Sequence, residues 1–513
     1  NISAAIPRST LIMDKFLDLP KWQLALLSGV LIGAAYPPSP LGFLAWFGLV
    51  PLIHLLYNAS PVEGAKWSFL TGVTVNIITI YWFGLNSGAG LFPVFLSLTG
   101  AVLYLSIFWI IFGMCTSWYH QRTGYGLAVL PIFWVGMEYI RSFGPLAFPW
   151  INLALTQTFS LPLLQIADVT GSTGISFWIV LINAILYAGY GSSIGLKSSL
   201  QIVTLLLVLI SSLGVYRISS IRNETIVDQI STAIVQPNID PNKKWEADFR
   251  DKIFDIMDSL HTASIDLQPD LILWPEAALP VYLRITYGAR RPILRKVRDS
   301  GIPLLTGTPD RINRENNERD YYNGALYFTP DGSMKMYYKM HLVPFAEYIP
   351  FSEKFPMLKR LNFGQGNFTS GRDFTLFEVD SVPFGNLICY ESSIPTIVSQ
   401  FVRHGAKFLS IETNDSWCGH TSGVYQHFQI ARLRAVENRV AIARSANTGI
   451  SSLILPTGEI AEKIPYNEQK IILAEIPIRD LASFYMRFGE LFAIICSLIS
   501  IILLGTGWVK NRS

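Results

Sequence analysis

Apolar residues gather in long runs at both ends of the chain, and a more polar region separates them. From Trp22 to about Arg217 the runs are broken only by short polar stretches. Charged residues return from about Asn223 to Ile478, and one last apolar run extends from Phe484 to Val509. This pattern predicts three parts: a membrane domain at residues 1–222, a large soluble domain at 223–480, and a final transmembrane helix with its tail at 481–513.

A helix that crosses a bilayer requires about 20 mostly apolar residues. The runs therefore predict about eight spans, seven of them before residue 222. Their approximate ranges are 22–36, 41–57, 66–86, 90–119, 127–142, 175–192, 199–218 and 484–509. The first two are short and are separated by "YPPSP", so a broken re-entrant pair is an alternative for them.

The middle region alternates strand-like and helix-like segments. Strands are expected at "TAIVQPN", "LILWPEA", "IPLLTGTPD", "GNLICYE" and "KIILAEIPI", and a helix at "EADFRDKIFDIMDSLHTASI". Two hairpins are expected, with turns at Asp331-Gly332 and Thr457-Gly458. Strands that alternate with helices and hairpins predict a layered α/β domain.

The composition agrees with a membrane protein. Hydrophobic residues make up 50% of the chain and charged residues 15%, whereas soluble domains carry about 25% charged residues. Mean hydropathy is +0.35. The chain has no long basic run with interleaved aromatic residues, so no nucleic-acid partner is expected.

Basic residues near short loops predict the orientation of the bundle. With the N-terminus inside the cell, the cytoplasmic side collects Arg8, Lys15, Lys21, Lys66, Arg122, Lys197, Lys510 and Arg512. The short loops of the opposite side hold few basic residues, Arg141 among them. The soluble domain is therefore expected outside the cytoplasm, and an even number of spans returns the C-terminus to the inside.

Three polar residues follow apolar strands in the soluble domain. Glu276 follows "LILWP", Lys339 lies in "MYYKMHLVPF", and Cys389 follows "GNLI". A carboxylate can take the proton of a thiol, and a lysine can stabilise the oxyanion that forms when the thiolate adds to a carbonyl. These residue types suit acyl transfer, although strand-end glutamates and hairpin lysines are commonly only solvated.

The four cysteines leave a second possibility. A Cys389–Cys418 disulfide is an alternative, because a domain outside the cytoplasm permits one. Cys115 and Cys496 lie in predicted spans.

The segments "LILWPEAALP", "YYKMHLVPFAEYIP", "GNLICYESSIP" and "NDSWCGHTSGVYQHFQIARLRAVENR" together resemble the bacterial apolipoprotein N-acyltransferases, membrane-embedded members of the nitrilase superfamily. "VQPNIDPNKKW", "WVGMEYIRS", "FPWINLALTQ" and the final span are similar to that family too, so the resemblance covers essentially the whole chain. It implies an all-α membrane bundle of about eight helices and an extracytoplasmic nitrilase-like domain built as an αββα sandwich.

The resemblance also implies a role for each matching residue. Glu276 is expected as general base, Lys339 as oxyanion stabiliser and Cys389 as the nucleophile that carries the acyl group. Supporting roles are implied for Glu347, Tyr390, Glu391 and Trp245. The chain departs from the family at Ala346, where glycine is usual, and at Cys418, where an aromatic residue is more common. Since a disulfide would block Cys389, both thiols are expected to be free.

The implied reaction moves an acyl chain from a membrane phospholipid, through a thioester on Cys389, to the α-amino group of an apolipoprotein's diacylglyceryl-cysteine. Neither metal nor cofactor is expected, and no His/Cys/Asp cluster in the sequence has ligand spacing. The resemblance places the protein in the bacterial inner membrane with its catalytic domain in the periplasm, and a monomer is expected.

Two other functions remain open at this stage. A membrane-anchored amidase or nitrilase would use the same three residues and let water resolve the thioester. A transporter with a soluble binding domain is disfavoured, because the spans carry few ionisable residues; Glu138 and Arg141 lie toward a helix end.

Overall fold

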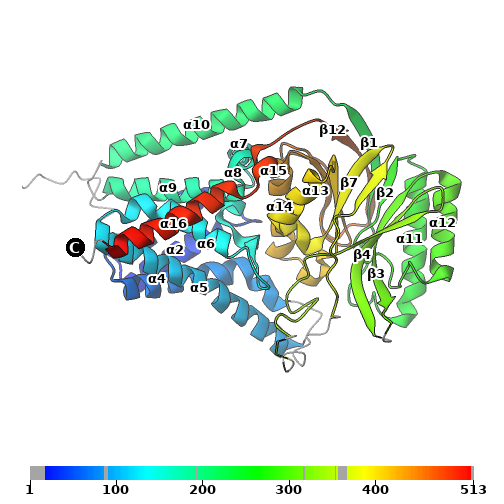
Figure 1. Ribbon diagram of the computed structural model, residues 1–513, viewed down its shortest axis with the longest axis horizontal. Helices are drawn as coiled ribbons and strands as arrows, with labels where there is room; N and C mark the ends of the chain where they lie inside the picture. The colour runs from blue at the N-terminus through cyan, green and yellow to red at the C-terminus, as the bar shows by residue number, and fades with distance from the viewer. Residues whose placement is uncertain are drawn as a thin grey trace, which may run out of the picture.

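The computed structural model describes residues 18–85, 90–190, 195–315, 318–352, 354–355, 357 and 367–509. A bundle of long helices forms one end of the molecule, and a two-sheet domain forms the other (Figure 1). The main helices of the bundle are α2 (Lys21–Ala34), α3 (Val50–Tyr57), α4 (Pro61–Ile80), α5 (Leu91–Thr123), α6 (Gly126–Ile140), α9 (Ser172–Tyr190), α10 (Leu196–Asn223) and α16 (Leu491–Val509).

Short elements connect these helices. They are η1 (Gly42–Trp46), η2 (Tyr81–Leu85), η3 (Pro149–Ile151), η4 (Leu153–Gln157), α7 (Leu161–Leu164), α8 (Ala167–Thr170) and α15 (Phe484–Phe488). The predicted run 484–509 is therefore two helices, because Gly489 adopts a left-handed φ of 62° between α15 and α16.

Five helices in the described residues are long and apolar enough to cross a membrane: Pro61–Leu85, Phe92–Thr123, Ser172–Tyr190, Leu196–Asn223 and Leu491–Val509. The predicted spans at 22–36, 41–57 and 127–142 form shorter apolar helices, Lys21–Ala34, Gly42–Tyr57 and Gly126–Ile140. The protein is thus a membrane protein, whereas the total of eight spans stays a prediction. Of the basic residues used to orient the bundle, Arg8, Lys15, Lys510 and Arg512 lie outside the described residues.

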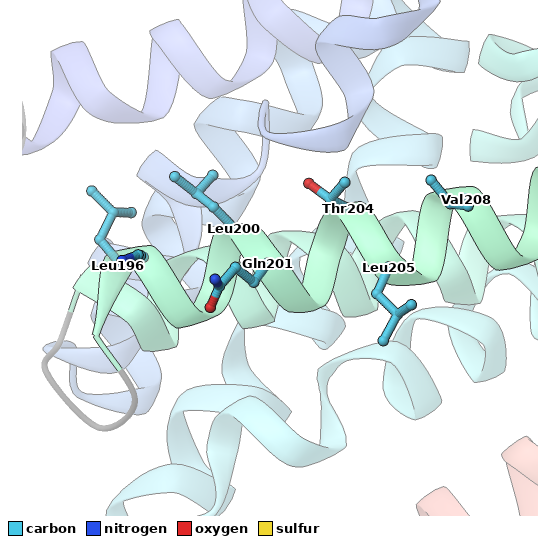
Figure 2. A pocket seen from close by; sticks show the side chains of 7 residues that line it. Leu196, Leu200, Gln201, Thr204, Leu205 and Val208 are labelled. Carbon is cyan, nitrogen blue, oxygen red and sulfur yellow. The ribbon is translucent and has the colours of Figure 1, made fainter.

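The outer faces of the bundle are apolar. Side chains along the first half of α10 line a groove of about 700 Å³ (Figure 2). Leu200, Leu205 and Val208 are each about half exposed or more, as expected for a surface that meets lipid tails. This groove lies along the part of α10 most distant from β1, so it is separate from the two-sheet domain (Figure 1).

The two-sheet domain has one sheet in the order β12-β1-β2-β3-β4-β5 and a second in the order β11-β10-β9-β8-β7-β6. The strands of the first are β1 (Asp228–Gln236), β2 (Leu271–Leu273), β3 (Leu304–Asn313), β4 (Arg319–Phe328), β5 (Met334–Tyr338) and β12 (Lys470–Ile478). The strands of the second are β6 (Leu376–Val379), β7 (Val382–Ile388), β8 (Phe408–Thr413), β9 (Ala441–Ala446), β10 (Ser451–Ile454) and β11 (Ile460–Ile464).

Each sheet contains three adjacent parallel strands, β1-β2-β3 and β7-β8-β9. Both predicted hairpins are confirmed, as β4–β5 and β10–β11. Their turn glycines, Gly332 and Gly458, have φ of 87° and 82°, a conformation that glycine adopts without steric cost.

Helices cover both outer faces of the paired sheets. α11 (Arg250–Ile265) and α12 (Tyr287–Ser300) bury Ile253, Met257 and Val297 against the first sheet. α13 (Pro395–Arg403) and α14 (Ser422–Asn438) cover the second sheet, where Phe401 lies against Gly385 of β7. This αββα sandwich is the predicted fold class.

α14 also forms the boundary with the membrane bundle, and every residue of it except Tyr425 is buried. The Gln426 side chain donates to the Thr79 carbonyl (3.0 Å) and accepts from the Trp150 indole (3.0 Å). The predicted domain boundaries near residues 222 and 480 stay predictions; in the structure α10 ends at Asn223 and β12 at Ile478.

Candidate active site

The ends of three strands from both sheets bring Glu276, Lys339 and Cys389 to one cavity. Glu276 follows β2, whereas Lys339 and Cys389 come directly after β5 and β7. The cavity has a volume of about 970 Å³ and is also lined by Glu347 and Trp245. Five of the seven predicted site residues therefore line one cavity. The volume of this cavity is within the usual range for ligand pockets.

Lys339 is only 1% exposed and lies between two carboxylates. Its Nζ donates to Glu347 Oε1 at 2.9 Å and lies 3.9 Å from Glu276 Oε1. Burial alone lowers the pKa of Lys339, but the charges of Glu347 and Glu276 outweigh it, so the pKa is raised. The lysine therefore stays positively charged beside the cysteine.

Glu276 is held in place by a backbone contact and by two donors. Its Oε1 accepts from the Asn323 side-chain amide (2.7 Å), and its Oε2 accepts from the Asn414 backbone N–H (2.8 Å). Gly307 of β3 permits this position, because a Cβ there would lie 2.5 Å from the Glu276 Cα. The two donors fix both carboxylate oxygens, which leaves the carboxylate with a defined orientation toward the cavity.

Cys389 occupies a strained turn at the end of β7. Its φ of 52° is left-handed, a conformation that costs a non-glycine residue free energy and that clusters at functional sites. Burial raises the pKa of the Cys389 thiol, and the Glu276 carboxylate raises it further, while Lys339 opposes the shift. The resting group is thus the thiol, and a base must remove its proton before it can act as a nucleophile.

Glu391, completely buried, ties the lysine loop to the cysteine turn. Its Oε1 accepts from the Tyr337 hydroxyl (2.8 Å) and from the backbone N–H of Met340 (2.7 Å) and His341 (3.2 Å). Its Oε2 accepts from the backbone N–H of Ile388 at 2.8 Å. Glu391 therefore fixes the segment after Lys339 against the residue before Cys389.

Tyr390 connects the cysteine turn to the membrane bundle. Its hydroxyl donates to the Ala147 carbonyl at 2.9 Å, and its ring stacks on Trp150 with centroids 6.0 Å apart. A second contact of this kind joins the Tyr348 hydroxyl to the Pro145 carbonyl at 2.6 Å. Tyr390 and Glu391 do not line the cavity; they support its walls from behind.

A polar group that the sequence reasoning missed lies behind the cysteine. His427 Nδ1 lies 2.7 Å from Asp415 Oδ1, and Nε2 lies 3.1 Å from the Cys389 carbonyl oxygen. Arg444 donates to Asp415 Oδ2 at 2.7 Å. Burial alone raises the pKa of Asp415, but Arg444 and His427 reverse this and lower it to about 2. The ionised Asp415 thus orients the imidazole that contacts the cysteine backbone.

Ligand-type atoms of Cys389, Asp415 and His427 lie within 4.8 Å of one another. Both Asp415 oxygens already accept hydrogen bonds, from Thr413 and Arg444, and His427 contacts protein groups through both nitrogens. This set is committed to internal hydrogen bonds, which does not fit a metal site.

The described cysteines are all free thiols: Cys115, Cys389, Cys418 and Cys496. This confirms the expectation that Cys389 and Cys418 do not form a disulfide. Cys418 is 1% exposed, and burial raises its pKa well above the ordinary value. Unlike Cys389, Cys418 does not line the cavity.

Asn323 and Asn414, which hold Glu276, are not among the predicted site residues. Asn414 follows the apolar strand β8, so the pattern that singled out Glu276 and Cys389, a polar residue at a strand end, marks it as well. Asn323 lies inside β4, and no such signal distinguishes it from other polar strand residues.

Comparison with known proteins gives the class of the domain and then the family of the chain. Residues 231–485 match the family described as carbon-nitrogen hydrolase, and residues 28–185 match the apolipoprotein N-acyltransferase N-terminal domain. The fold and site thus define a carbon-nitrogen hydrolase domain joined to a membrane bundle. The chain belongs to the apolipoprotein N-acyltransferase family.

The relatives cover nearly the full chain. The apolipoprotein N-acyltransferase of Geobacter metallireducens is 32% identical over 495 residues, which cover 94% of this chain and 95% of the relative. That of Chlorobaculum tepidum is 32% identical over 527 residues, covering 95% and 97%. Among solved structures, a carbon-nitrogen hydrolase from Helicobacter pylori is 16% identical with a TM-score of 0.38, covering 48% of this chain and 89% of its own.

Proposed function

We propose that the protein transfers an acyl chain from a membrane phospholipid, through a thioester on Cys389, to the α-amino group of the diacylglyceryl-cysteine of apolipoproteins. The observation that carries the proposal is the meeting of Glu276, Lys339 and Cys389 in one cavity. The near-complete match to relatives named apolipoprotein N-acyltransferase supports it.

The first half-reaction forms the thioester. Glu276 takes the proton from Cys389 Sγ, and the thiolate attacks the sn-1 ester carbonyl to form a C–S bond. Lys339 Nζ, with a backbone N–H near Tyr390, stabilises the oxyanion. The ester C–O bond then breaks, and the lysophospholipid alkoxide leaves with the proton that Glu276 held.

The second half-reaction uses the same groups in reverse. The α-amino nitrogen of the acceptor attacks the thioester carbonyl, and Glu276 takes a proton from that nitrogen. The C–S bond breaks to give the amide, and Cys389 recovers the proton from Glu276. Glu347 keeps Lys339 aligned through the 2.9 Å ion pair during both steps.

We also propose that the bundle lies in the bacterial inner membrane with the catalytic domain in the periplasm, and that the protein acts as a monomer. Charges within the described residues support this orientation. Lys197 lies at the start of α10, whose other end leads to β1, and Arg122 lies in the last turn of α5. Lys21 pairs with Glu63 in the first turn of α4 at 2.9 Å. These helix ends are remote from the catalytic domain, as cytoplasmic ends would be.

The decisive experiment follows the acyl group on the cysteine. We expect purified full-length protein, incubated with phospholipid vesicles, to gain the mass of one acyl chain on the peptide containing Cys389. A diacylated lipopeptide added next is expected to remove this mass and to become N-acylated. Cys389→Ala is expected to abolish both, whereas Cys418→Ala, which removes the neighbouring buried thiol, is expected to retain them.

Two outcomes would overturn the proposal. N-acylation that persists in Cys389→Ala would exclude the cysteine as acyl carrier. An adduct that is lost to water without forming acylated lipopeptide would identify a hydrolase instead, the amidase-like alternative.

A further inference from the structure

Lys244 is a buried cation to which the reaction assigns no role. It belongs to the turn at residues 241–245 that precedes α11, and it is 1% exposed, although its neighbours Lys243 and Trp245 are exposed. Its Nζ makes no hydrogen bond with any described residue. A buried ammonium without a partner is costly, so its presence calls for a compensating charge nearby.

The turn that carries Lys244 is fastened to the segment that holds Glu276. Asn447 is the connecting residue: its Oδ1 accepts from the Ile239 backbone N–H (3.0 Å), and its Nδ2 donates to Asn414 Oδ1 (3.1 Å). The Asn414 backbone N–H in turn donates to Glu276. Asn242 and Trp245, on either side of Lys244, line the catalytic cavity together with Glu276.

Glu276 is the charged group that acts on Lys244. Burial lowers the pKa of Lys244 to about 8, and the Glu276 carboxylate opposes this shift. Other charged residues lie along the chain on either side of Lys244: Asp240, Lys243, Glu246 and Arg250. At neutral pH the Lys244 ammonium is therefore charged, and it attracts the carboxylate of Glu276, the proposed base.

The buried charges of the cavity are unequal without Lys244. Glu276 and Glu347 carry two negative charges, and Lys339 carries one positive charge. Arg250 also lines the cavity, but its side chain is exposed and screened by solvent. An additional buried cation brings the sum to neutrality.

We propose that Lys244 is a positioning residue for the proposed reaction: its buried ammonium balances the second carboxylate of the cavity and keeps Glu276 ionised, ready to take the Cys389 proton. The inference rests on the proposed function. It assigns to Lys244 no contact with substrate, only an electrostatic effect on the Glu276–Cys389 pair.

The test measures the reactivity of Cys389 against pH without any acyl donor. Full-length protein in detergent is treated with iodoacetamide, and alkylation of the Cys389 peptide is followed by mass spectrometry, which separates it from Cys418. In Lys244→Met we expect the acidic limb of the alkylation profile to shift to higher pH by about one unit. At a given pH on that limb, alkylation of Cys389 is then about tenfold slower than in the wild type. Lys243→Met, the exposed neighbour, is the matched control and is expected to leave the profile unchanged.

Lys244→Arg separates charge from shape. It is expected to keep the acid side of the wild-type profile and to lose the change of slope near pH 8 that Lys244 itself causes. A Lys244→Met profile identical to wild type would overturn the inference, as would an arginine variant shifted as far as the methionine variant. If Lys244→Met is recovered only as aggregate, the test relies on Lys244→Arg. A change of slope near pH 8 that persists in Lys244→Arg would contradict the role proposed for Lys244.

The acyl-transfer assay tells the two proposals apart. Wild-type protein that forms no acyl adduct, while its alkylation profile still depends on Lys244, would overturn the proposed function and leave the charge balance intact. Normal transfer together with unchanged profiles in both Lys244 variants would overturn only the role of Lys244.

Discussion

The Glu391 carboxylate accepts four hydrogen bonds from groups on both sides of the site, so the position of the Lys339 and Cys389 segments depends on its two acceptor oxygens. A glutamine in its place has one oxygen where the carboxylate has two, and its amide N–H₂ faces donors instead of acceptors. We expect Glu391→Gln to lower the rate of acyl-enzyme formation about a hundredfold, because the Lys339 and Cys389 segments shift relative to each other.

The measurement is the initial rate of adduct formation on Cys389. Glu378→Gln is the control, since Glu378 is an exposed glutamate on β6. A Glu391→Gln protein with the wild-type rate would show that the four hydrogen bonds do not position the site.

Glu412 of β8 is another buried carboxyl near the site, and both of its oxygens lack a hydrogen bond within the described residues. Burial raises its pKa well above the ordinary value, and the Glu276 carboxylate raises it further. The folded protein therefore keeps the Glu412 proton at a pH at which the unfolded chain has lost it. Stability falls as pH rises above the unfolded pKa of about 4.3, and the whole loss is reached at the folded pKa.

Glu412→Gln cannot ionise, so it removes this loss. We expect the variant to be more stable than wild type at pH 8, because ionisation of residue 412 then favours the unfolded state of the wild-type protein only. Near pH 4 the two proteins are expected to be equally stable. Thermal unfolding at both pH values measures the difference, with exposed Glu462→Gln as control; a variant that is less stable at pH 8 would contradict the expectation.

Sequence patterns singled out Glu276, Lys339 and Cys389, because each follows an apolar strand, but not the buried polar residues around them. Lys243 and Lys244 are adjacent residues of the same type, and only the folded turn shows that Lys244 is buried while Lys243 is exposed. The same holds for Glu412, whose neighbours in β8 are ordinary strand residues. Burial depends on contacts between distant segments, and a local pattern does not contain them.

At the scale of elements, the sequence predicted the order of strands and helices well and some of their ends poorly. β2 stops at Leu273, whereas the apolar pattern continues to Ala277. Pro275 explains the early end, because it has no N–H to donate to the neighbouring strand. The chain is then free to turn, and this places Glu276 in the cavity.

The final apolar run shows a similar difference. Hydropathy predicts one helix from 484 to 509, but Tyr485 is fully buried and its hydroxyl donates to Glu490 Oε1 at 2.6 Å. This contact lies at the break around Gly489, between α15 and α16. A hydropathy average does not register a single partly buried carboxylate within an apolar run.

At the scale of the whole molecule, a buried ion pair between Asp168 and Arg439 holds the catalytic domain on the bundle. Asp168 of α8 lies 2.8 Å from Arg439, at the end of α14, and 2.8 Å from Arg217 of α10. Asp168 and Arg439 are both buried. Asp168→Asn leaves both arginines without their counter-ion, and removal of one partner from a buried pair costs about 3–5 kcal/mol.

We therefore expect Asp168→Asn to lower the thermal midpoint of the full-length protein and to increase proteolysis between the bundle and the catalytic domain. Asp480→Asn is the control, since it breaks the exposed Lys407–Asp480 pair, whose side chains are 46% and 68% exposed. Such surface pairs contribute about 0–1 kcal/mol. Equal midpoints for the two variants would show that the Asp168 pairs do not hold the domains together.

The burial of α14 on all sides has a practical consequence for anyone who isolates the catalytic domain. One face of this helix meets the second sheet and the other meets the bundle, so a fragment of residues 223–480 would expose apolar side chains and unpaired arginines to water. Tyr390, too, would lose the Trp150 ring and the Ala147 carbonyl that hold the cysteine turn. Inhibitor screens therefore require the intact membrane protein, because the bundle supports the cysteine turn and covers α14 as well as anchoring the enzyme.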